Sequence, residues 1–383
     1  MVKKSRIKSY FSKIQDFGYL GIGNISGAII LSLFWIFLAS LLGPDSYGEV
    51  SYLIAIANTI SVIAFLGAGQ TITVYVAKGV KIENITYTIT LISSIITSVI
   101  IFLILEKIEV SLYVIGYVIF GLISHELLGL KLFKKYSKIL VLQRMLIVSL
   151  SLIFYLLLGL EGIVLGYAIA FFPFVILLKK GFKETKRDFT LLKPRLGFMM
   201  NNYGKDLAKI LSRSVDKIII FPIFGAAILG NYQLGFQILM LLTLIPSIVY
   251  QYTLPRESSG EKNKKLQIGS IVVSIILTIL VILIGPSISN LIFPKFIDAM
   301  NIIHIMSLAI IPISISYIFT SKFFAMEKSK FVMMGSAIFL LTQISLIVLL
   351  GDIFGIIGIA SSLVIAAIIE AIFLSVAFKF YSK

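Results

Sequence analysis

The chain has 383 residues, of which 58% are hydrophobic, and a mean hydropathy of +1.04, far above the range of a water-soluble domain of average composition. It contains no cysteine and two histidines, His125 and His304, so disulfide frameworks, thiolate metal sites and histidine clusters are excluded. The net charge of +16 does not indicate nucleic acid here, because in a membrane protein basic residues gather on the cytoplasmic side.

An apolar helix needs about 20 residues to cross a bilayer, so the chain has room for about twelve crossings. The segment before the first crossing has apolar residues at helical spacing among lysines, namely Ile7, Tyr10, Phe11 and Ile14. This pattern predicts a short amphipathic helix on the membrane surface, with a disordered basic tail as the alternative. The expected spans are 19–42, 50–76, 85–105, 110–129, 139–158, 161–178, 206–228, 231–254, 267–288, 301–321, 331–350 and 354–376.

Basic residues are concentrated in every second connecting segment, as twelve crossings with the charge on one side require. If both termini are cytoplasmic, nearly all of the 34 Lys and Arg residues fall in inner segments. The exceptions are Lys107 and Lys295 in outer loops and Arg213 and Lys217 within the seventh span. The sequence therefore predicts a multi-pass protein of the cytoplasmic membrane with both termini inside.

The two halves of the chain carry similar glycine patterns. Gly43 and Gly48 follow the first span, as Gly225 and Gly230 follow the seventh. We also align Gly159 and Gly166 with Gly351 and Gly358, and both alignments indicate a duplication in parallel orientation. The expected organisation is a basic amphipathic segment (1–18), an N-terminal six-helix bundle (19–178), a cytoplasmic linker (179–205), a C-terminal six-helix bundle (206–376) and a cytoplasmic tail (377–383).

The seventh span carries an unusual charged stripe. Asp206, Lys209, Arg213, Asp216 and Lys217 fall within an arc of about 100° on an otherwise apolar helix. A charge at the bilayer centre costs about 2.5–3.5 kcal/mol, so these groups should face protein or water. On one interpretation they line a central cavity that attracts an anionic group such as a diphosphate. On the other, Arg213 and Asp216 neutralise each other while Lys209 and Lys217 reach toward the inner surface.

Other polar residues at membrane depth are weaker candidates. Arg144, at the inner end of span five, could join the cavity, as could Asn24 and Gln70, although most such residues form interhelical hydrogen bonds. His304 could couple transport to protons but is more typical of a structural histidine. Four prolines should bend the spans that contain them, and they are Pro173, Pro222, Pro246 and Pro312.

An enzyme is not expected. The sequence has no G-x-x-x-x-G-K-[ST] phosphate loop, and its short outer loops have no carboxylate or histidine cluster. A membrane-embedded glycosyl ligase or polymerase would need acidic or arginine-rich outer loops, and the sequence does not have them. No cofactor is predicted, and coupling to H⁺ or Na⁺ stays open.

Residues 38–80 and 216–239, with the GIVLGYAIA and FGIIGIASS stretches, resemble the polysaccharide biosynthesis and O-antigen flippase family of the multidrug/oligosaccharidyl-lipid/polysaccharide (MOP) exporter superfamily. The most specific piece is the L-G-P-[DE]-x-[YF]-G turn of Leu42–Gly48, and Asp216 matches the aspartate that opens the family's seventh-span motif. Members often have arginines where this chain has Ser40 and Val74, so any role of those arginines cannot be carried over.

The resemblance implies an all-α membrane fold of two six-helix bundles in a V shape, like that of the multidrug exporters called MATE. It also implies transport of a polyprenyl-diphosphate-linked oligosaccharide from the inner to the outer leaflet by alternating access. Membrane lipids are expected partners, and a polysaccharide polymerase or glycosyltransferases are compatible ones. The alternatives are a cation-coupled exporter of small amphipathic molecules and a non-catalytic scaffold of a polysaccharide synthesis complex.

Overall fold

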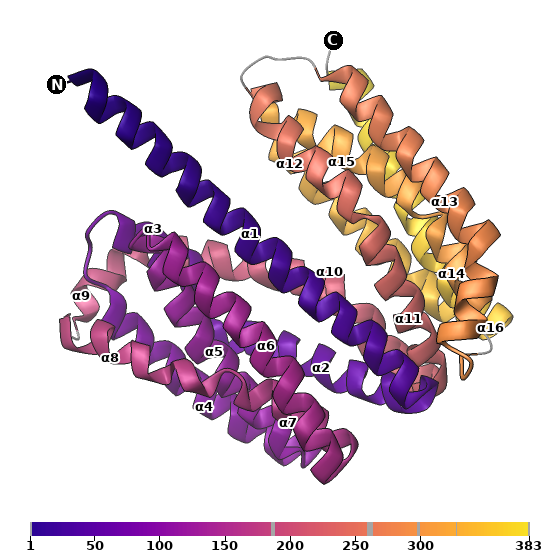
Figure 1. Cartoon of the computed structure of the whole chain (residues 1–383), viewed down its shortest axis with the longest axis horizontal. Coiled ribbons are helices and arrows are strands. Elements are labelled where there is room, and N and C mark those ends of the chain that lie inside the picture. Colours follow the sequence, from indigo (N-terminus) through magenta and orange to yellow (C-terminus); the bar gives the residue numbers. More distant parts are fainter. Residues whose placement is uncertain (1, 185–187, 259–262, 297–298, 327, 382–383) are drawn as a thin grey trace. The chain divides into compact units, whose positions relative to one another are not determined.

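The computed structural model describes residues 2–184, 188–258, 263–296, 299–326 and 328–381, in which all regular structure is helical (Figure 1). The side chains of residues 2–17 lie outside the described part, so the amphipathic face of Ile7, Tyr10, Phe11 and Ile14 stays a prediction. The helices of the first half are α1 (Val2–Leu42), α2 (Pro44–Phe65), α3 (Ala68–Ala77), α4 (Glu83–Leu105), α5 (Ile108–Gly129), α6 (Phe133–Leu158), α7 (Leu160–Ile169), the short 3₁₀ helix η1 (Phe172–Phe174), α8 (Val175–Glu184), α9 (Phe189–Leu192) and the 3₁₀ helix η2 (Lys193–Arg195). The remaining helices are α10 (Leu196–Phe224), α11 (Ala226–Leu242), α12 (Leu244–Ser258), α13 (Lys264–Ile292), α14 (Ala299–Ser307), α15 (Ile310–Ala325) and α16 (Ser329–Tyr381).

The apolar helices account for the predicted crossings. Nine helices of the described residues are long and apolar enough to span a membrane, and the bent pair α11–α12 makes a tenth. The 53 residues of α16 are long enough for two crossings, and non-helical backbone at Gly355 divides it. Counting α16 as two crossings gives eleven. The charged residues of α10 make it less apolar than the other spans, and counting it as well gives the twelve crossings expected from the sequence. The chain is therefore a multi-pass membrane protein.

The outward faces of these helices are apolar, as a lipid environment requires. In the most apolar stretch of α13 only 17% of the residues are buried within the protein, and in that of α4 only 22%. Leu103 on α4, Leu156 on α6 and Leu283 on α13 are all largely exposed. Such surfaces would aggregate in water, so the bilayer is the solvent for these faces.

The chain divides into two compact units whose boundaries fall within helices. Unit 1 comprises residues 1–34 and 53–214, and unit 2 comprises residues 35–52 and 215–383. The end of α1, the turn at Gly43 and the start of α2 therefore belong to unit 2, although they come early in the chain. The segment 179–205, which we expected to be a linker, is mostly helical in unit 1, where Leu192 and Met199 are buried.

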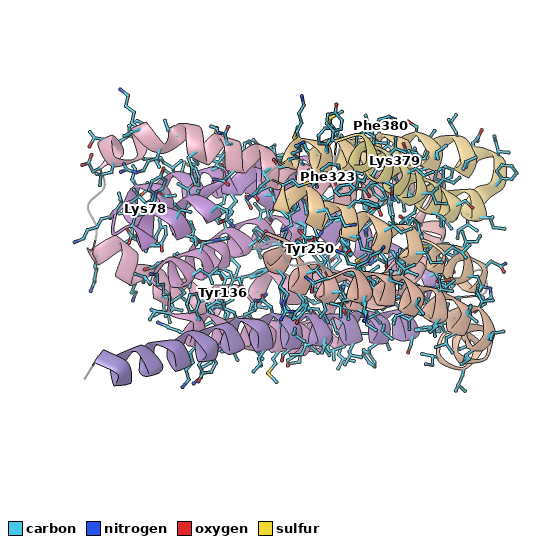
Figure 2. All side chains as sticks on the ribbon, turned by 90° about the horizontal axis from the view of Figure 1, so that it is seen from above. Lys78, Tyr136, Tyr250, Phe323, Lys379 and Phe380 are labelled. Carbon is cyan, nitrogen blue, oxygen red and sulfur yellow. The ribbon has the colours of Figure 1, made fainter. Side chains whose placement is uncertain are left out.

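Within unit 1, α5 is the central helix and contacts α3, α4, α6, α7 and α8. Within unit 2, α14 and α16 share a buried core with α11, and α15 packs along α16. A smaller cluster surrounds Phe323, a residue labelled in Figure 2, which is fully buried and stacks on Phe331. Each unit therefore has a hydrophobic core of its own.

Three of the four prolines coincide with interruptions of the spans, as predicted. Pro173 lies in η1 between α7 and α8, Pro246 follows the 42° bend between α11 and α12, and Pro312 follows the break between α14 and α15. The fourth, Pro222, lies inside α10, which continues through it to Phe224. Proline lacks an amide donor, so a helix that has already broken accommodates it easily.

The repeated glycine turn packs against its own counterpart in unit 2. Gly43 and Gly225 both have left-handed backbone, with φ of 83° and 89°, and each precedes a helix. A Cβ at Gly48 would overlap the carbonyl of Ala226, and a Cβ at Gly230 would overlap the carbonyl of Pro44. The two contacts are reciprocal, because each involves the residue after the counterpart's turn glycine, and they support the predicted duplication.

The second pair of glycines needs a different alignment. The helix break before α7 is at Gly159 (φ 70°, ψ −143°), and the matching break in α16 is at Gly355 (φ 57°, ψ −138°) rather than at Gly351. Three residues after each break, Gly162 and Gly358 pack against a backbone carbonyl of the preceding helical segment. The alignment of Gly159 with Gly351 was therefore wrong by one helical turn.

Candidate functional site

Helix α10 carries the charged stripe, and its two ends are held in different units. In unit 1 its first turns pack on the corner between α2 and α3, where a Cβ at Gly67 would overlap the backbone of Met199 and Tyr203. Tyr75 of α3 also meets Phe198 edge to face, with ring centroids 5.6 Å apart. In unit 2 the ring of Phe221 stacks on Tyr52 at 4.1 Å. Asp206, Lys209 and Arg213 consequently belong to unit 1, and Asp216 and Lys217 belong to unit 2.

Asp216 and Lys217 form a buried ion pair. Asp216 is 3% exposed and Lys217 is 7% exposed. The Lys217 Nζ lies 3.2 and 3.3 Å from the two carboxylate oxygens, and the Lys217 amide donates to Asp216 Oδ1 at 2.8 Å. The ammonium group also lies 4.1 Å from the centroid of the Phe236 ring on α11, a cation–π geometry. Both charges therefore have partners within unit 2.

Two further residues extend this network across the unit. The Tyr232 hydroxyl of α11 donates to Asp216 Oδ2 at 2.9 Å, and Gln343 Nε2 of α16 donates to the Tyr232 oxygen at 3.3 Å. All four residues are buried, so the network ties α10, α11 and α16 together. These contacts favour a structural role for Asp216 and Lys217 over the cavity role that we predicted for them.

The remaining stripe residues are different. Lys209 and Arg213 are exposed, and Asp206 is half-buried. Lys209 lies within electrostatic range of Lys205, Arg213 and Asp206, so the unit 1 part of α10 contains three cations and one carboxylate. This excess of positive charge on a membrane-spanning helix is suited to attract an anion.

Arg144 of α6 lies among aromatic side chains of unit 1. It is half-buried and packs against Gly27 of α1, where a Cβ would lie 3.3 Å from Arg144 Cγ. Tyr113 and Tyr117 of α5 and Tyr136 of α6 are all within electrostatic range of its guanidinium (Figure 2 labels Tyr136). We did not predict these tyrosines from the sequence, although Tyr113 and Tyr117 are four residues apart, a spacing that places them on one helix face.

The aromatic group connects Arg144 with α10. Tyr117 lies within electrostatic range of Asp206 as well as of Arg144. Tyr113 donates a hydrogen bond of 2.9 Å to Asn58 Oδ1, and its ring stacks on Tyr167 with centroids 6.3 Å apart. Unit 1 thus brings together an arginine, hydroxyl groups and aromatic faces, a combination that can bind phosphate oxygens and sugar rings.

The other predicted site residues lie around this group or apart from it. Asn24 is exposed on α1, donates to the Leu20 carbonyl at 2.8 Å and accepts a long hydrogen bond of 3.5 Å from Tyr136. It therefore lies on the Arg144 side of unit 1. Gln70 is exposed on α3 and, within the described part of the chain, shares no hydrogen bond or ion pair with the other candidates. No group of three or more metal-ligating side chains occurs among the described residues.

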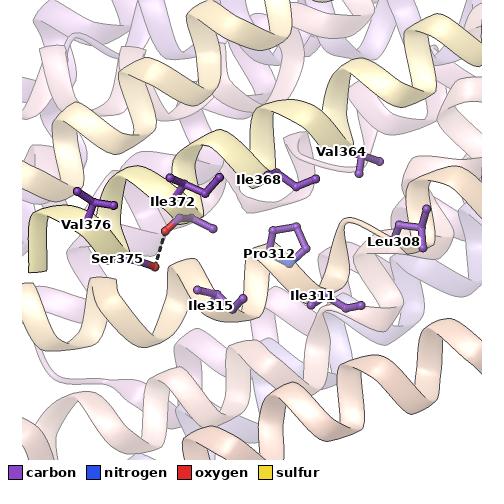
Figure 3. Close-up of a pocket in the computed structure, with 10 residues that line it drawn as sticks. Leu308, Ile311, Pro312, Ile315, Val364, Ile368, Ile372, Ser375 and Val376 are labelled. Atoms are coloured by element: carbon purple, nitrogen blue, oxygen red, sulfur yellow. Dashed lines mark hydrogen bonds between the residues drawn. The ribbon is translucent and has the colours of Figure 1, made fainter. Parts of the chain in front are cut away.

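A large apolar groove lies in unit 2 between α15 and the second half of α16 (Figure 3). Its volume is about 610 Å³, and the only polar side chain among its lining residues is Ser375, whose hydroxyl donates to the Ala371 carbonyl at 2.6 Å. Leu308, Pro312 and Ile372 are among the residues that form its walls. A groove of this kind accepts hydrocarbon and offers nothing to a diphosphate.

No protein-family model matches the sequence, and no curated protein sequence matches it. Solved structures with a similar fold include the lipid II flippase MurJ in an inward closed conformation, with a TM-score of 0.77 and 14% identity over 94% of this chain and 87% of MurJ. An inward-facing MATE family multidrug resistance transporter of the MOP superfamily has a TM-score of 0.69 and 15% identity over 95% of this chain and 96% of its own.

A MOP superfamily transporter from Pyrococcus furiosus has a TM-score of 0.59 and 15% identity, over 95% of each chain. At these identities the likeness establishes the fold alone. The chain has the all-helical membrane fold that MurJ and the MATE transporters share.

Proposed function

We propose that this protein is a transporter that moves a polyprenyl-diphosphate-linked oligosaccharide from the cytoplasmic to the outer leaflet by alternating access. The fold supports transport, because the similar solved structures are a lipid II flippase and multidrug transporters. The sequence resemblance to O-antigen flippases supports an oligosaccharide cargo. The process requires no bond chemistry, since the lipid only changes leaflet, so the protein is not an enzyme in this proposal.

The observation that carries the proposal is a group of cations on two membrane-spanning helices of unit 1. Lys209 and Arg213 are exposed on α10, and Arg144 is half-buried on α6 beside Tyr113 and Tyr117. A diphosphate group would offset the cost of placing these cations within a hydrocarbon layer. Arginine can bind it with two parallel hydrogen bonds, while the tyrosine hydroxyls and ring faces suit sugars.

The proposed site is therefore narrower than the stripe read from the sequence. It comprises Arg144, Lys209 and Arg213, with Asn24 and Gln70 as peripheral candidates. Asp216 and Lys217 support the site by fixing α10 in unit 2. The proposal places the protein in the cytoplasmic membrane with both termini inside, and it leaves open whether H⁺ or Na⁺ drives the movement.

The test replaces Lys209 and Arg213 together by glutamine and measures translocation of a fluorescent lipid-linked oligosaccharide in reconstituted vesicles. Each lost charge-assisted hydrogen bond contributes about 1.5–3 kcal/mol, so the rate should fall at least tenfold. The matched control replaces Lys264 and Lys265, which are exposed at the start of α13, and removes the same net charge. Equal transport by the double variant and the control would refute the proposed site.

A cation-coupled exporter of small amphipathic molecules is the second candidate, favoured by the fold shared with a MATE transporter and by the apolar groove of Figure 3. Efflux of a lipophilic cation driven by a proton or sodium gradient would distinguish it. Under this alternative the charge-removing variant should transport such a cation faster or at an unchanged rate, because removing positive charge does not weaken binding of a cation.

A further inference from the structure

A polar pocket lies in unit 1, and none of its lining residues belongs to the Arg144 group. It has a volume of about 260 Å³ and is enclosed by the end of α5, the turn into α6 and one side of α8. Its charged residues are Glu126, Lys135 and Lys179, and the other lining residues are apolar. We propose that this pocket binds the phosphoethanolamine headgroup of a membrane phospholipid.

The location places the pocket at the surface of the membrane. Glu126 is three residues from the end of α5, Lys135 is in the first turn of α6, and Lys179 lies near the end of the span formed by α7 and α8. These ends belong to the side that the sequence assigns to the cytoplasm. A phospholipid presents its headgroup at this depth, whereas its chains extend along the helices toward the bilayer centre.

Glu126 forms the acidic part of the pocket. Its side chain is 5% exposed and lines the pocket, and its Oε2 accepts a hydrogen bond of 2.7 Å from Tyr87 on α4. Tyr87 is itself fixed, because its ring packs against Gly181 and meets Phe182 of α8 edge to face at 5.5 Å. A fixed carboxylate in the lining of an interfacial pocket is suited to accept hydrogen bonds from a primary ammonium group.

Lys135 and Lys179 form the basic part. Both are exposed, and they approach the pocket from different helices, α6 and α8. Two ammonium groups beside one carboxylate match a zwitterion in which a phosphate and an ammonium are joined by a short linker. The lysines would bind the phosphate oxygens and Glu126 would bind the ammonium.

Size and apolar surroundings fit the same ligand. A volume of 260 Å³ equals that of about eight to nine water molecules in the liquid, enough for a headgroup of roughly eight non-hydrogen atoms. Leu130, Leu132 and Ile176 line the pocket and are exposed, so they offer apolar surface to the glycerol and first chain carbons of a lipid. A soluble phosphoethanolamine would not use that surface. We therefore commit to the lipid as the occupant.

The experiment is native mass spectrometry of the full chain released from nanodiscs that contain equal amounts of phosphatidylethanolamine, phosphatidylcholine and phosphatidylglycerol. We expect phosphatidylethanolamine to be retained about tenfold over phosphatidylcholine, whose quaternary ammonium cannot donate hydrogen bonds. Phosphatidylglycerol should also be retained less, because its headgroup brings no cation to Glu126. Equal retention of the three lipids by the unaltered protein would overturn the proposal.

Variants separate the two halves of the pocket. Glu126→Gln should abolish the preference for phosphatidylethanolamine over phosphatidylcholine, and Lys135→Gln combined with Lys179→Gln should reduce retention of both. Lys193→Gln, on the exposed side of η2, is the control for lost positive charge and should behave as the unaltered protein. If Glu126→Gln does not fold, the lysine pair decides the question, because these side chains are exposed. Unchanged retention in the lysine variant would contradict the proposal.

A competition arm identifies the source of the headgroup. Soluble phosphoethanolamine should displace the retained lipid only at concentrations far above that of the lipid, because it does not contact Leu130, Leu132 and Ile176. Displacement at equal concentration would refute a lipid site and would indicate a site for the free compound. The result does not depend on which substrate the protein transports.

Discussion

The buried pair of Asp216 and Lys217 predicts a specific pattern of stabilities. Breaking a buried ion pair by removing one partner leaves the other charge uncompensated, at a cost of about 3–5 kcal/mol. Asp216→Asn leaves an ammonium that is 7% exposed without its carboxylate, and Lys217→Met leaves a carboxylate that is 3% exposed. Each single variant should therefore lose about 3 kcal/mol of unfolding free energy.

The double variant, Asp216→Asn with Lys217→Met, should lose much less than the sum. It leaves neither charge of the pair in place, the asparagine side chain would keep an acceptor for the Tyr232 hydroxyl, and methionine has nearly the shape of the lysine stem against Phe236. We expect a coupling free energy of at least about 2 kcal/mol. The assay is reversible unfolding in dodecyl maltoside micelles with increasing SDS, followed by circular dichroism.

The control for this cycle is Lys209→Met, which removes an exposed cation from the unit 1 part of the same helix and should change stability by less than about 1 kcal/mol. The same proteins also test function. A folded double variant should transport at close to the unaltered rate, because neither residue contacts the cargo in our proposal. Additive single effects, or lost transport in a stable double variant, would refute the structural role of the pair.

Two further predictions concern backbone contacts and pH. Gly48→Ala should destabilise the protein by about 1–3 kcal/mol, because its Cβ would overlap the backbone of the counterpart turn, whereas Gly269→Ala has open space and should be neutral or slightly stabilising in the same SDS titration. Asp188, which lies between the membrane-spanning segments, accepts hydrogen bonds from the amide and the hydroxyl of Thr190, and these donors hold its pKa below the ordinary value. A lowered pKa means that the helix cap persists at neutral pH and is lost as the pH falls through that pKa, so amide exchange at Thr190 should lose protection only in acid, and in Asp188→Ala at every pH.

Hydropathy predicted the membrane class and the number of crossings because each span is a long apolar stretch. It did not predict that several spans are interrupted. The break between α2 and α3 occurs at Leu66 and Gly67, which both have positive φ. Hydropathy averaged over the length of a span does not detect a change in the backbone at two residues. The prolines indicated three other breaks because their effect is local and independent of apolarity.

The glycine repeat shows a second limit of sequence reasoning. Gly351, Gly355 and Gly358 all lie near the expected junction, and a spacing of seven residues selected Gly351. The property that the two halves share is a left-handed backbone with strongly negative ψ, found at Gly159 and Gly355. A glycine that permits close helix packing and a glycine at which the chain reverses cannot be told apart in the sequence. Their backbone dihedral angles distinguish them.

The stripe on α10 shows why intramembrane charge is an ambiguous signal. Helical spacing placed five ionisable residues on one side, but consecutive residues such as Asp216 and Lys217 do not face each other on a helix, and their pairing was not expected. The long lysine side chain folds back to its neighbour, and its ammonium group lies 4.1 Å from the centroid of the Phe236 ring of α11. That contact comes from tertiary packing, which the sequence of α10 does not contain.

The distribution of charge along α10 therefore favours a transport role for its unit 1 part and a structural role for its unit 2 part. An ionisable residue inside a membrane span suggests a functional role by default, but the inference weakens once the protein itself supplies the opposite charge. Asp216 and Lys217 meet this condition within unit 2. The unit 1 part of α10 carries Lys205, Lys209 and Arg213 and one carboxylate, Asp206, and Arg144 of α6 adds a further cation to unit 1. An anionic cargo would balance that excess, so substitutions in the unit 1 half of α10 should affect transport before stability, and substitutions in the unit 2 half should affect stability before transport.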